Sequence, residues 1–245
     1  MKYLHDIGEY FLMLKKVFGR MTKTSVLRGL IFKEIDDLII SSLGIVIFIS
    51  FFIGGVVTIQ TALNLNNPLI PKSLIAFTAR QSIILEFSPT FISIIMAGKV
   101  GSNITSSIGT MRVMEQIDAL EVMGINSANY LIFPKIIAML FYPFVIAISM
   151  FVGIAGAYAA GVLGGFVAGE QFLNGLQNDF ISFHLVYAFI KTFFFAIILA
   201  TIPAYHGYYM KGGALEVGKA STTAFVWTSV VLILANYLLT QLLLS

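Results

Sequence analysis

Three ionisable residues interrupt long apolar stretches of the sequence: Arg80, Glu86 and Lys191. A charge at the centre of a membrane helix costs about 2.5–3.5 kcal/mol to insert, whereas each Leu, Ile, Phe or Val returns only about 0.3–0.6 kcal/mol. The stretch that carries both Arg80 and Glu86 should therefore face a protein interior or a wet cavity. Charges in that setting can attract a lipid phosphate, relay an ion, or pair with one another.

Two interpretations of these charges stay open. In the first, Lys191 and Arg80 attract a lipid phosphate while Glu86 gates or balances the two cations. In the second, Glu86 and Lys191 form an ion pair that only fixes the register of two helices. Pro89 bears on both, because it removes the backbone donor that would bond the carbonyl of Leu85. It therefore predicts a kink beside Glu86.

Other chemistries lack their residues. The sequence has no cysteine, its three histidines are scattered, and neither H-E-x-x-H nor G-x-S-x-G occurs. The run GALEVGK, residues 213–219, matches most of a phosphate-binding loop, but Ala220 stands where that motif needs a Ser or Thr for magnesium. Asn236 is an intramembrane amide, a group that often bonds a neighbouring helix. We expect no catalytic residue, no metal site and no cofactor bound by this chain.

Composition places the chain in a membrane. Of its 245 residues, 58% are hydrophobic and 11% are charged, which excludes a soluble domain with a solvated surface. The formal net charge of only +3 gives no support to nucleic-acid binding. A bilayer core of about 30 Å needs roughly 20 apolar residues per helix. We expect an all-α membrane protein in which residues 1–37 precede a transmembrane domain, 38–245, with spans at about 38–63, 73–97, 130–163, 183–204 and 224–244.

The basic residues predict an orientation. Twelve Lys and Arg residues lie on one side: seven before the first span, two between the second and third, Lys135 at the near edge of the third, and two between the fourth and fifth. The alternate segments hold only Lys72. Loops rich in Lys and Arg stay in the cytoplasm. We therefore expect a cytoplasmic amino terminus and an external carboxyl terminus.

Two patterns concern packing. Before the first span, near Lys15, Lys16 and Arg20, an apolar stripe recurs at Leu4, Ile7, Phe11, Leu14 and Phe18. It indicates an amphipathic helix in the cytoplasmic headgroup layer, with a coiled-coil seam or packing against the spans as alternatives. Small residues recur every fourth position at Gly153, Ala157, Gly161, Gly165 and Gly169, with a neighbouring stripe that includes Gly156. Such faces allow close helix contact, either across a dimer seam or within one subunit.

The loop after the second span predicts a docking helix. Residues 110–123 read TMRVMEQIDALEVM and stop at Gly124. Val113, Ile117 and Leu120 share one face of a single helix over 110–124, and acidic residues share another. We interpret this helix as a site that a partner grips, with an ordinary solvated connection as the alternative. Its expected contact residues are Glu115, Gln116, Ile117, Asp118, Leu120, Glu121, Met123 and Gly124.

Residues 97–135, AGKVGSNITSSIGTMRVMEQIDALEVMGINSANYLIFPK, resemble the signature of the MlaE/YrbE family of ABC permeases. A second family signature is matched by GYYMKGGALEVGKASTTAFV, residues 207–226. The resemblance implies an MlaE-like permease fold in a bacterial inner membrane and a second copy of the chain. It also implies a cytoplasmic ABC ATPase that holds ATP and magnesium and docks around residues 115–123. The other implied partners are a periplasmic carrier with an MCE domain and, as cargo, phospholipid or a related lipid.

The chain departs from the family pattern at three places. Leu85 stands where many relatives have an arginine, Ile108 or Ser107 replaces an acidic residue, and Ala128 or Ser127 replaces a proline. Inferences about lipid headgroup contacts are weaker for that reason. The rival function is an ion-coupled secondary transporter that uses Glu86 and Lys191 as its relay. A structural scaffold is the third alternative.

Overall fold

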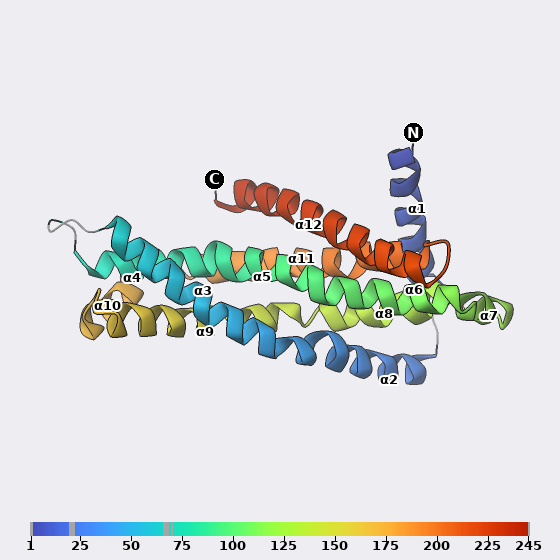
Figure 1. Ribbon diagram of the computed structural model, residues 1–245, viewed down its shortest axis with the longest axis horizontal. Coiled ribbons are helices and arrows are strands. Elements are labelled where there is room, and N and C mark those ends of the chain that lie inside the picture. Colours follow the sequence, from blue (N-terminus) through green and yellow to red (C-terminus); the bar gives the residue numbers. More distant parts are fainter. Residues whose placement is uncertain (1, 20–22, 66–68, 70, 245) are drawn as a thin grey trace. The chain divides into compact units, whose positions relative to one another are not determined.

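The computed structural model describes residues 2–19, 23–65, 69 and 71–244 (Figure 1). In those residues every regular element is a helix. Five helices of the described chain are long and apolar enough to cross a membrane: Thr24–Asn64, Ser73–Val113, Ser127–Leu163, Phe183–Tyr208 and Ala214–Leu244. The all-α fold class with five membrane-crossing helices is therefore confirmed, and the chain is a multi-pass membrane protein.

These helices extend beyond the apolar runs that predicted them. The first begins at Thr24 and the second continues to Val113, because intrahelical hydrogen bonds carry a helix through polar residues that hydropathy does not mark. The first comprises α2 (Thr24–Glu34), η1 (Ile35–Ile39), η2 (Ile40–Ser42) and α3 (Leu43–Asn64). The second comprises α4 (Ser73–Ser82), η3 (Ile83–Phe91), α5 (Ile92–Met96), η4 (Ala97–Gly101) and α6 (Ser102–Val113). The others are α8 (Ser127–Met139) with α9 (Tyr142–Leu163), then α11 (Phe183–Tyr208) and α12 (Ala214–Leu244).

The chain divides into two compact units. The first unit contains Met1–Ser42, Ile94–Tyr142 and Phe193–Thr240. The second unit contains Leu43–Ser93, Pro143–Thr192 and Gln241–Ser245.

In the second unit, glycines bring the backbones of α3 and α9 into contact. A Cβ atom added to Gly54 would lie 1.9 Å from the carbonyl oxygen of Gly153, and one added to Gly156 would lie 2.0 Å from that of Phe51. Both distances are far inside van der Waals contact, so only glycine fits at these positions. The small-residue face of α9 therefore packs against α3 within one subunit, at Gly153 and Gly156.

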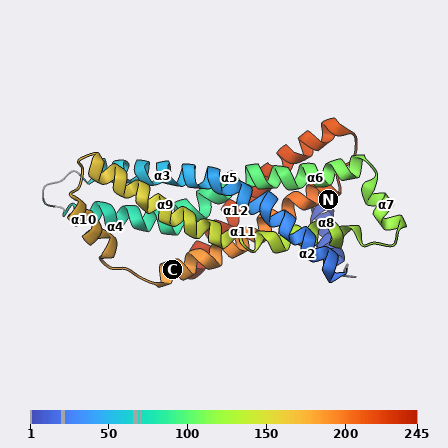
Figure 2. The same ribbon diagram turned by 90° about the horizontal axis from the view of Figure 1, so that it is seen from below.

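The small-residue stripe ends earlier than its spacing predicts. Helix α9 stops at Leu163, and Gly165 has a φ of 73°, the left-handed conformation that often ends a helix. A short helix that the sequence did not predict, α10 (Gly169–Gln177), follows and lies beside α4 (Figures 1 and 2). Its Phe172 is fully buried in an apolar cluster with Ala76, Ile83 and Ala157.

In the first unit, the amino-terminal helix α1 (Lys2–Val17) is tied to the start of α8. The amide of Asn129 donates to the carbonyl of Val17 at 2.7 Å, and that of Asn126 donates to the carbonyl of Lys16 at 2.8 Å. These bonds satisfy carbonyls that every helix end leaves free. Of the predicted apolar stripe, Ile7, Phe11 and Phe18 are exposed and Leu14 is half-buried. The side chain of Leu4, and Arg20, lie outside the described residues.

Candidate functional site

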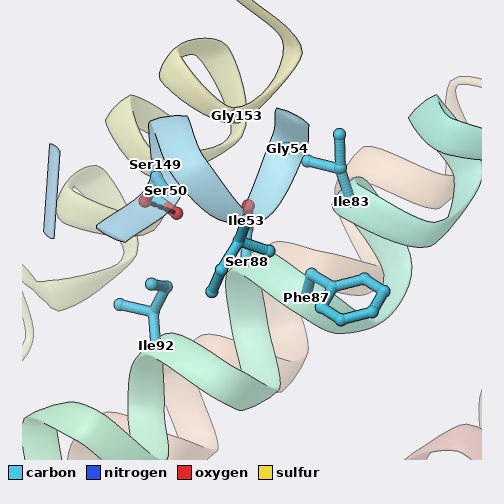
Figure 3. Close-up of a pocket in the computed structure, with 9 residues that line it drawn as sticks. All are labelled: Ser50, Ile53, Gly54, Ile83, Phe87, Ser88, Ile92, Ser149 and Gly153. Atoms are coloured by element: carbon cyan, nitrogen blue, oxygen red, sulfur yellow. Dashed lines mark hydrogen bonds between the residues drawn. The ribbon is translucent and has the colours of Figure 1, made fainter. Parts of the chain in front are cut away.

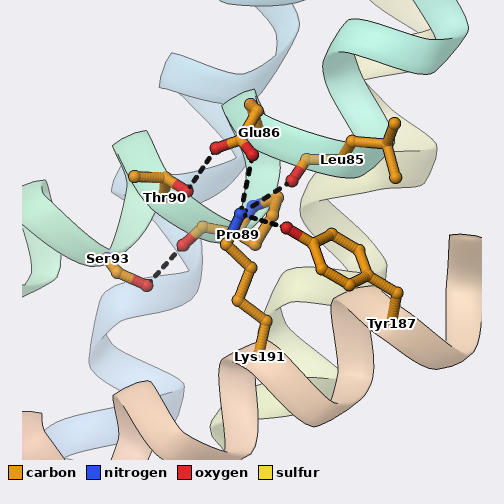
Figure 4. Close-up of polar contacts among 7 residues, drawn as sticks. All are labelled: Leu85, Glu86, Pro89, Thr90, Ser93, Tyr187 and Lys191. Carbon is orange, nitrogen blue, oxygen red and sulfur yellow. Dashed lines mark hydrogen bonds and ion pairs between the residues drawn. The ribbon is translucent and has the colours of Figure 1, made fainter. Parts of the chain in front are cut away.

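Lys191 forms the centre of a polar cluster inside the second unit (Figure 4). Its side chain is fully buried on α11, and its ammonium group donates to Oε1 of Glu86 at 2.9 Å and to the hydroxyl of Tyr187 at 2.9 Å. A third bond reaches the carbonyl oxygen of Leu85 at 3.1 Å. An ammonium has three donors, so the protein itself supplies an acceptor for each one.

Pro89 explains why a lysine is held there. In an α-helix the carbonyl of Leu85 would accept from residue 89, but proline has no N–H group to donate. The structure forms a π-helical segment, η3, around Pro89, and Lys191 donates to the Leu85 carbonyl from α11. Local π-helix and an inserted side chain are recognised causes of helix irregularity. Where the sequence predicts a kink beside Glu86, the structure has this π-helical segment.

Glu86 is the half-exposed member of the cluster. Its side chain is 39% exposed, whereas that of Lys191 is 0% exposed. The hydroxyl of Thr90 donates to Oε2 of Glu86 at 3.0 Å, so both carboxylate oxygens are bonded within the unit. The ion pair between Glu86 and Lys191, predicted as one of two alternatives, thus forms. Of its two side chains only that of Glu86 is accessible to a ligand or to water. This geometry favours an ion pair that fixes two helices over a lysine held free for a phosphate.

Arg80 takes no part in the contacts around Lys191. Its guanidinium donates to the carbonyls of Leu176 at 2.5 Å, Asn178 at 3.0 Å and Asp179 at 3.2 Å, at the end of α10. The rings of Phe77 and Phe180 lie 5.0 and 5.6 Å from it. A cation is favourable at a helix carboxyl end, where carbonyls lack partners. Arg80 therefore caps α10, a role that the sequence did not predict.

The serines beside this cluster enclose very little space (Figure 3). Ser50 on α3 donates to Ser149 on α9 at 2.8 Å, and both line a cavity of about 10 Å³ with Ser88 and Gly153. That volume suits at most about one water molecule. This polar point in the helix packing cannot hold a lipid.

The predicted docking helix is broken, and the expectation of one continuous helix over 110–124 is wrong. Helix α6 ends at Val113, and α7 (Gln116–Val122) begins after Glu115, whose φ of 58° is left-handed. The break separates Val113 from the face that Ile117 and Leu120 share. The prediction failed because Val113 and Ile117, on either side of the break, are four residues apart, the spacing of neighbours on one face of a continuous helix.

Helix α7 is fastened to the rest of the first unit by both apolar and polar contacts. Ile117 is fully buried, so it cannot be part of a ridge that a partner grips. Glu121 accepts from the hydroxyls of Ser127 at 2.9 Å and Tyr208 at 3.2 Å, and Asp118 pairs with Arg112 at 2.8 Å. Leu120 is half-buried, whereas the other predicted contact residues are exposed: Glu115, Gln116, Asp118, Glu121, Met123 and Gly124.

The apolar surface that α7 offers lies at its carboxyl end. Val122 is 89% exposed and Met123 is 65% exposed, and Met114 at the break is 63% exposed. Single exposed apolar side chains are ordinary, but the adjacent Val122 and Met123, both exposed where α7 ends, mark a candidate interface. Sequence periodicity missed Val122 because it assigned the apolar face to Val113, Ile117 and Leu120.

The run GALEVGK does not have the context of a phosphate-binding loop. It lies on α12 from Ala214 onward, and its Lys219 pairs with Glu216 at 2.7 Å. The P-loop joins a strand to a helix, and the described residues contain no strand. Asn236, the remaining predicted site residue, lies half-buried further along α12.

Comparison with known proteins identifies the family. The model of the family described as "Permease MlaE" matches residues 31–242. The chain belongs to this family. A "Probable ABC transporter permease protein" of Rickettsia bellii is 32% identical over 232 residues, covering 92% of this chain and 89% of the relative. One from Synechocystis is 30% identical over 241 residues, covering 95% and 88%.

A plant relative also matches. The protein "TRIGALACTOSYLDIACYLGLYCEROL 1, chloroplastic" of Arabidopsis thaliana is 33% identical over 209 residues, which cover 82% of this chain and 57% of the relative. This MlaE-family chain is therefore an ABC transporter permease, a class of subunit that works with an ATPase. The resemblance drawn from residues 97–135 and 207–226 is confirmed.

Proposed function

We propose that this permease moves phospholipid or a related lipid between the bacterial inner membrane and a periplasmic carrier with an MCE domain. The observation that carries the proposal is the family match over residues 31–242. The lipid named in the Arabidopsis relative supports a lipid cargo. In this arrangement the amino terminus is cytoplasmic and the carboxyl terminus periplasmic.

The proposal assigns ATP hydrolysis to a separate cytoplasmic ATPase that docks on α7. The exposed Val122 and Met123 would enter its surface, while the acidic residues of α7 would meet basic residues there. Burial of Ile117 and the hydrogen bonds of Glu121 fasten α7 to α8 and α11. A movement of the docked ATPase would therefore be transmitted through α7 to these two helices.

The proposal also includes a second copy of the chain. Helix α12 has the least covered apolar stretch among the five long helices of the described chain, with 11% of it buried against 28–56% in the others. Its exposed residues are therefore available to a second copy or to lipid. The glycine face of α9 is already occupied by α3 at Gly153 and Gly156.

Reconstitution with the ATPase tests the proposed function. Labelled phospholipid should reach an added carrier only while ATP is supplied and hydrolysed, and collapse of a proton gradient should leave the transfer unchanged. Transfer that continues without ATP but stops when the gradient collapses would instead support the ion-coupled alternative. Such a relay would have to use the half-exposed carboxylate of Glu86.

A further inference from the structure

An apolar groove runs beside α1 in the first unit, with α11 and α12 as its other walls. Its volume is about 480 Å³, within the range of roughly 300–1,000 Å³ that ligand pockets have. The walls include Ile7 and Phe11 of α1, Ile202 of α11, and Trp227 and Val231 of α12. Ile7, Phe11 and Trp227 are 55%, 63% and 42% exposed. The groove is therefore open to an apolar molecule from outside.

Polar contacts hold α1 in place as a wall of this groove. The hydroxyls of Tyr10 and Thr201 are 2.7 Å apart, and the hydroxyl of Tyr205 donates to Glu9 at 3.3 Å. Burial raises the pKa of Tyr10 above its ordinary value, so its hydroxyl stays protonated and keeps this bond. Helix α1 is therefore bonded to α11 at two points along the groove.

The apolar groove continues into a charged hollow. Asp6, Tyr205 and His206 line both spaces, and the second space has a volume of about 560 Å³. Its lining adds Glu9 and Lys211, together with other polar residues. The combined site is apolar at one end and carries charges of both signs at the other.

The charged hollow has the groups that an ammonium and a phosphate each need. Asp6 and Glu9 offer carboxylates, and the ring of Tyr205 lies 5.4 Å from that of His206 and 5.3 Å from that of Tyr209. Carboxylates and aromatic faces both attract an ammonium cation. Lys211 is exposed and has no ion pair among the described residues, so it can meet a phosphate.

We infer that the groove and the hollow together bind one phospholipid whose headgroup carries an ammonium, as phosphatidylethanolamine does. An acyl chain lies along Phe11, Ile202 and Trp227, the ammonium lies at Asp6 and Glu9, and the phosphate lies near Lys211. An anionic lipid without an amine, such as phosphatidylglycerol, lacks the cation that the two carboxylates select. This inference requires only a membrane-embedded chain and does not depend on the proposed transport.

Trp227 provides the measurement, because it is the only tryptophan in the sequence and it lines the groove. The full chain is reconstituted in unbrominated phosphatidylglycerol vesicles, because this headgroup carries no ammonium. A low fraction of phosphatidylethanolamine or phosphatidylglycerol with brominated acyl chains, which quench tryptophan fluorescence, is included. Half-maximal quenching should need about tenfold less of the ethanolamine lipid, the ratio expected from one charge-assisted contact.

Two variants test the selection of the headgroup. Asp6→Asn combined with Glu9→Gln should remove the difference between the two brominated lipids. Glu170→Gln on α10 removes a carboxylate of the other unit and should keep the difference. Thermal unfolding without added lipid checks that each variant is folded.

Three results would overturn the inference. The first is equal quenching by both lipids in the unaltered chain, and the second is an unchanged preference in the double variant. The third is the absence of quenching by either lipid together with a disulfide between two copies that carry Trp227→Cys, because a second copy would then fill the groove. If the reconstituted permease shows no ATP-driven lipid transfer but still prefers the ethanolamine lipid in the quenching measurement, the transport proposal is rejected and the lipid site stands.

Discussion

The ammonium of Lys191 lies 3.1 Å from the carbonyl oxygen of Leu85, the carbonyl that Pro89 leaves without its α-helical donor. One cation therefore satisfies both a carboxylate and an irregular backbone. The ion pair between Lys191 and Glu86 therefore stabilises the π-helical segment η3. These contacts explain the burial of Lys191 without a bound lipid.

Removal of Lys191 should destabilise the fold more than removal of the charge on Glu86. Lys191→Met leaves the carboxylate without its cation and leaves the Leu85 carbonyl without this donor, for a cost of about 3 kcal/mol. Glu86→Gln keeps an acceptor for Lys191 and should cost less, because Glu86 is 39% exposed and water screens the charge that remains. Thermal unfolding in mild detergent compares the two variants.

Lipid cross-linking separates the structural role of this pair from a lipid-binding role. In the folded fraction, Lys191→Met should cross-link to photoactivatable phospholipid as well as the unaltered chain does. A folded variant that has lost cross-linking would show that Lys191 holds the lipid phosphate.

Arg80→Gln should loosen α10. The three carbonyls at its carboxyl end would lose their cationic donor, which corresponds to about 1–3 kcal/mol. Hydrogen exchange of the amides in Gly169–Gln177 should become faster, while Lys72→Gln, an exposed basic residue of the same unit, should leave these rates unchanged. Unaltered exchange in Arg80→Gln would show that the cap contributes nothing to α10.

The glycine contact between α3 and α9 gives a matched pair of substitutions. Gly156→Ala places a methyl group 2.0 Å from the carbonyl oxygen of Phe51, so the helices must separate and the midpoint of thermal unfolding should fall. Gly44→Ala on α3 meets nothing within 4 Å and should be neutral or stabilising, since Ala favours a helix by about 1 kcal/mol over Gly. Equal midpoints would contradict close packing at Gly156.

Hydropathy was enough to predict the five long helices, because a run of about twenty apolar residues is the length that a helix needs to cross the bilayer core. It could not predict α10, whose burial depends on Phe172 entering a cluster with Ala76 and on Arg80 capping its end. Those partners are almost one hundred residues away in sequence. A short amphipathic segment carries no signal of such contacts.

The cluster around Lys191 was predicted only in part. The charges suggested the pair with Glu86, and Tyr187 lies one helical turn before Lys191, a spacing that could have revealed it. The left-handed Glu115 was not predictable in the same way, since glutamate has no preference for that conformation. The periodicity of apolar residues cannot reveal the break at Glu115, because Val113 and Ile117 keep a helical spacing of four residues across it.

Surface labelling of single cysteines should confirm the proposed orientation, because the chain has no cysteine of its own. A cysteine at Met123 or Leu215, both exposed, should react with an impermeant reagent only after the inner membrane is opened. One at the exposed Asn174 should react in intact spheroplasts. Gly124 is avoided because its φ of 74° disfavours a side chain. Reversed labelling at these positions would overturn the orientation.

The exposed end of α7 provides the test of ATPase docking. Val122→Asp puts a charge on a side chain that is 89% exposed, so the permease should fold normally while its apolar contact with the ATPase is lost. Loss of a central interface contact costs about 2 kcal/mol or more, so the co-purified ATPase should fall at least about tenfold. Leu163→Asp is the control, because Leu163 is 86% exposed at the end of α9, on the proposed periplasmic side. Ile117→Asp is uninformative, since a buried charge would detach α7 itself. An ATPase yield that is the same in Val122→Asp and Leu163→Asp as in the unaltered chain would exclude the end of α7 from the docking surface.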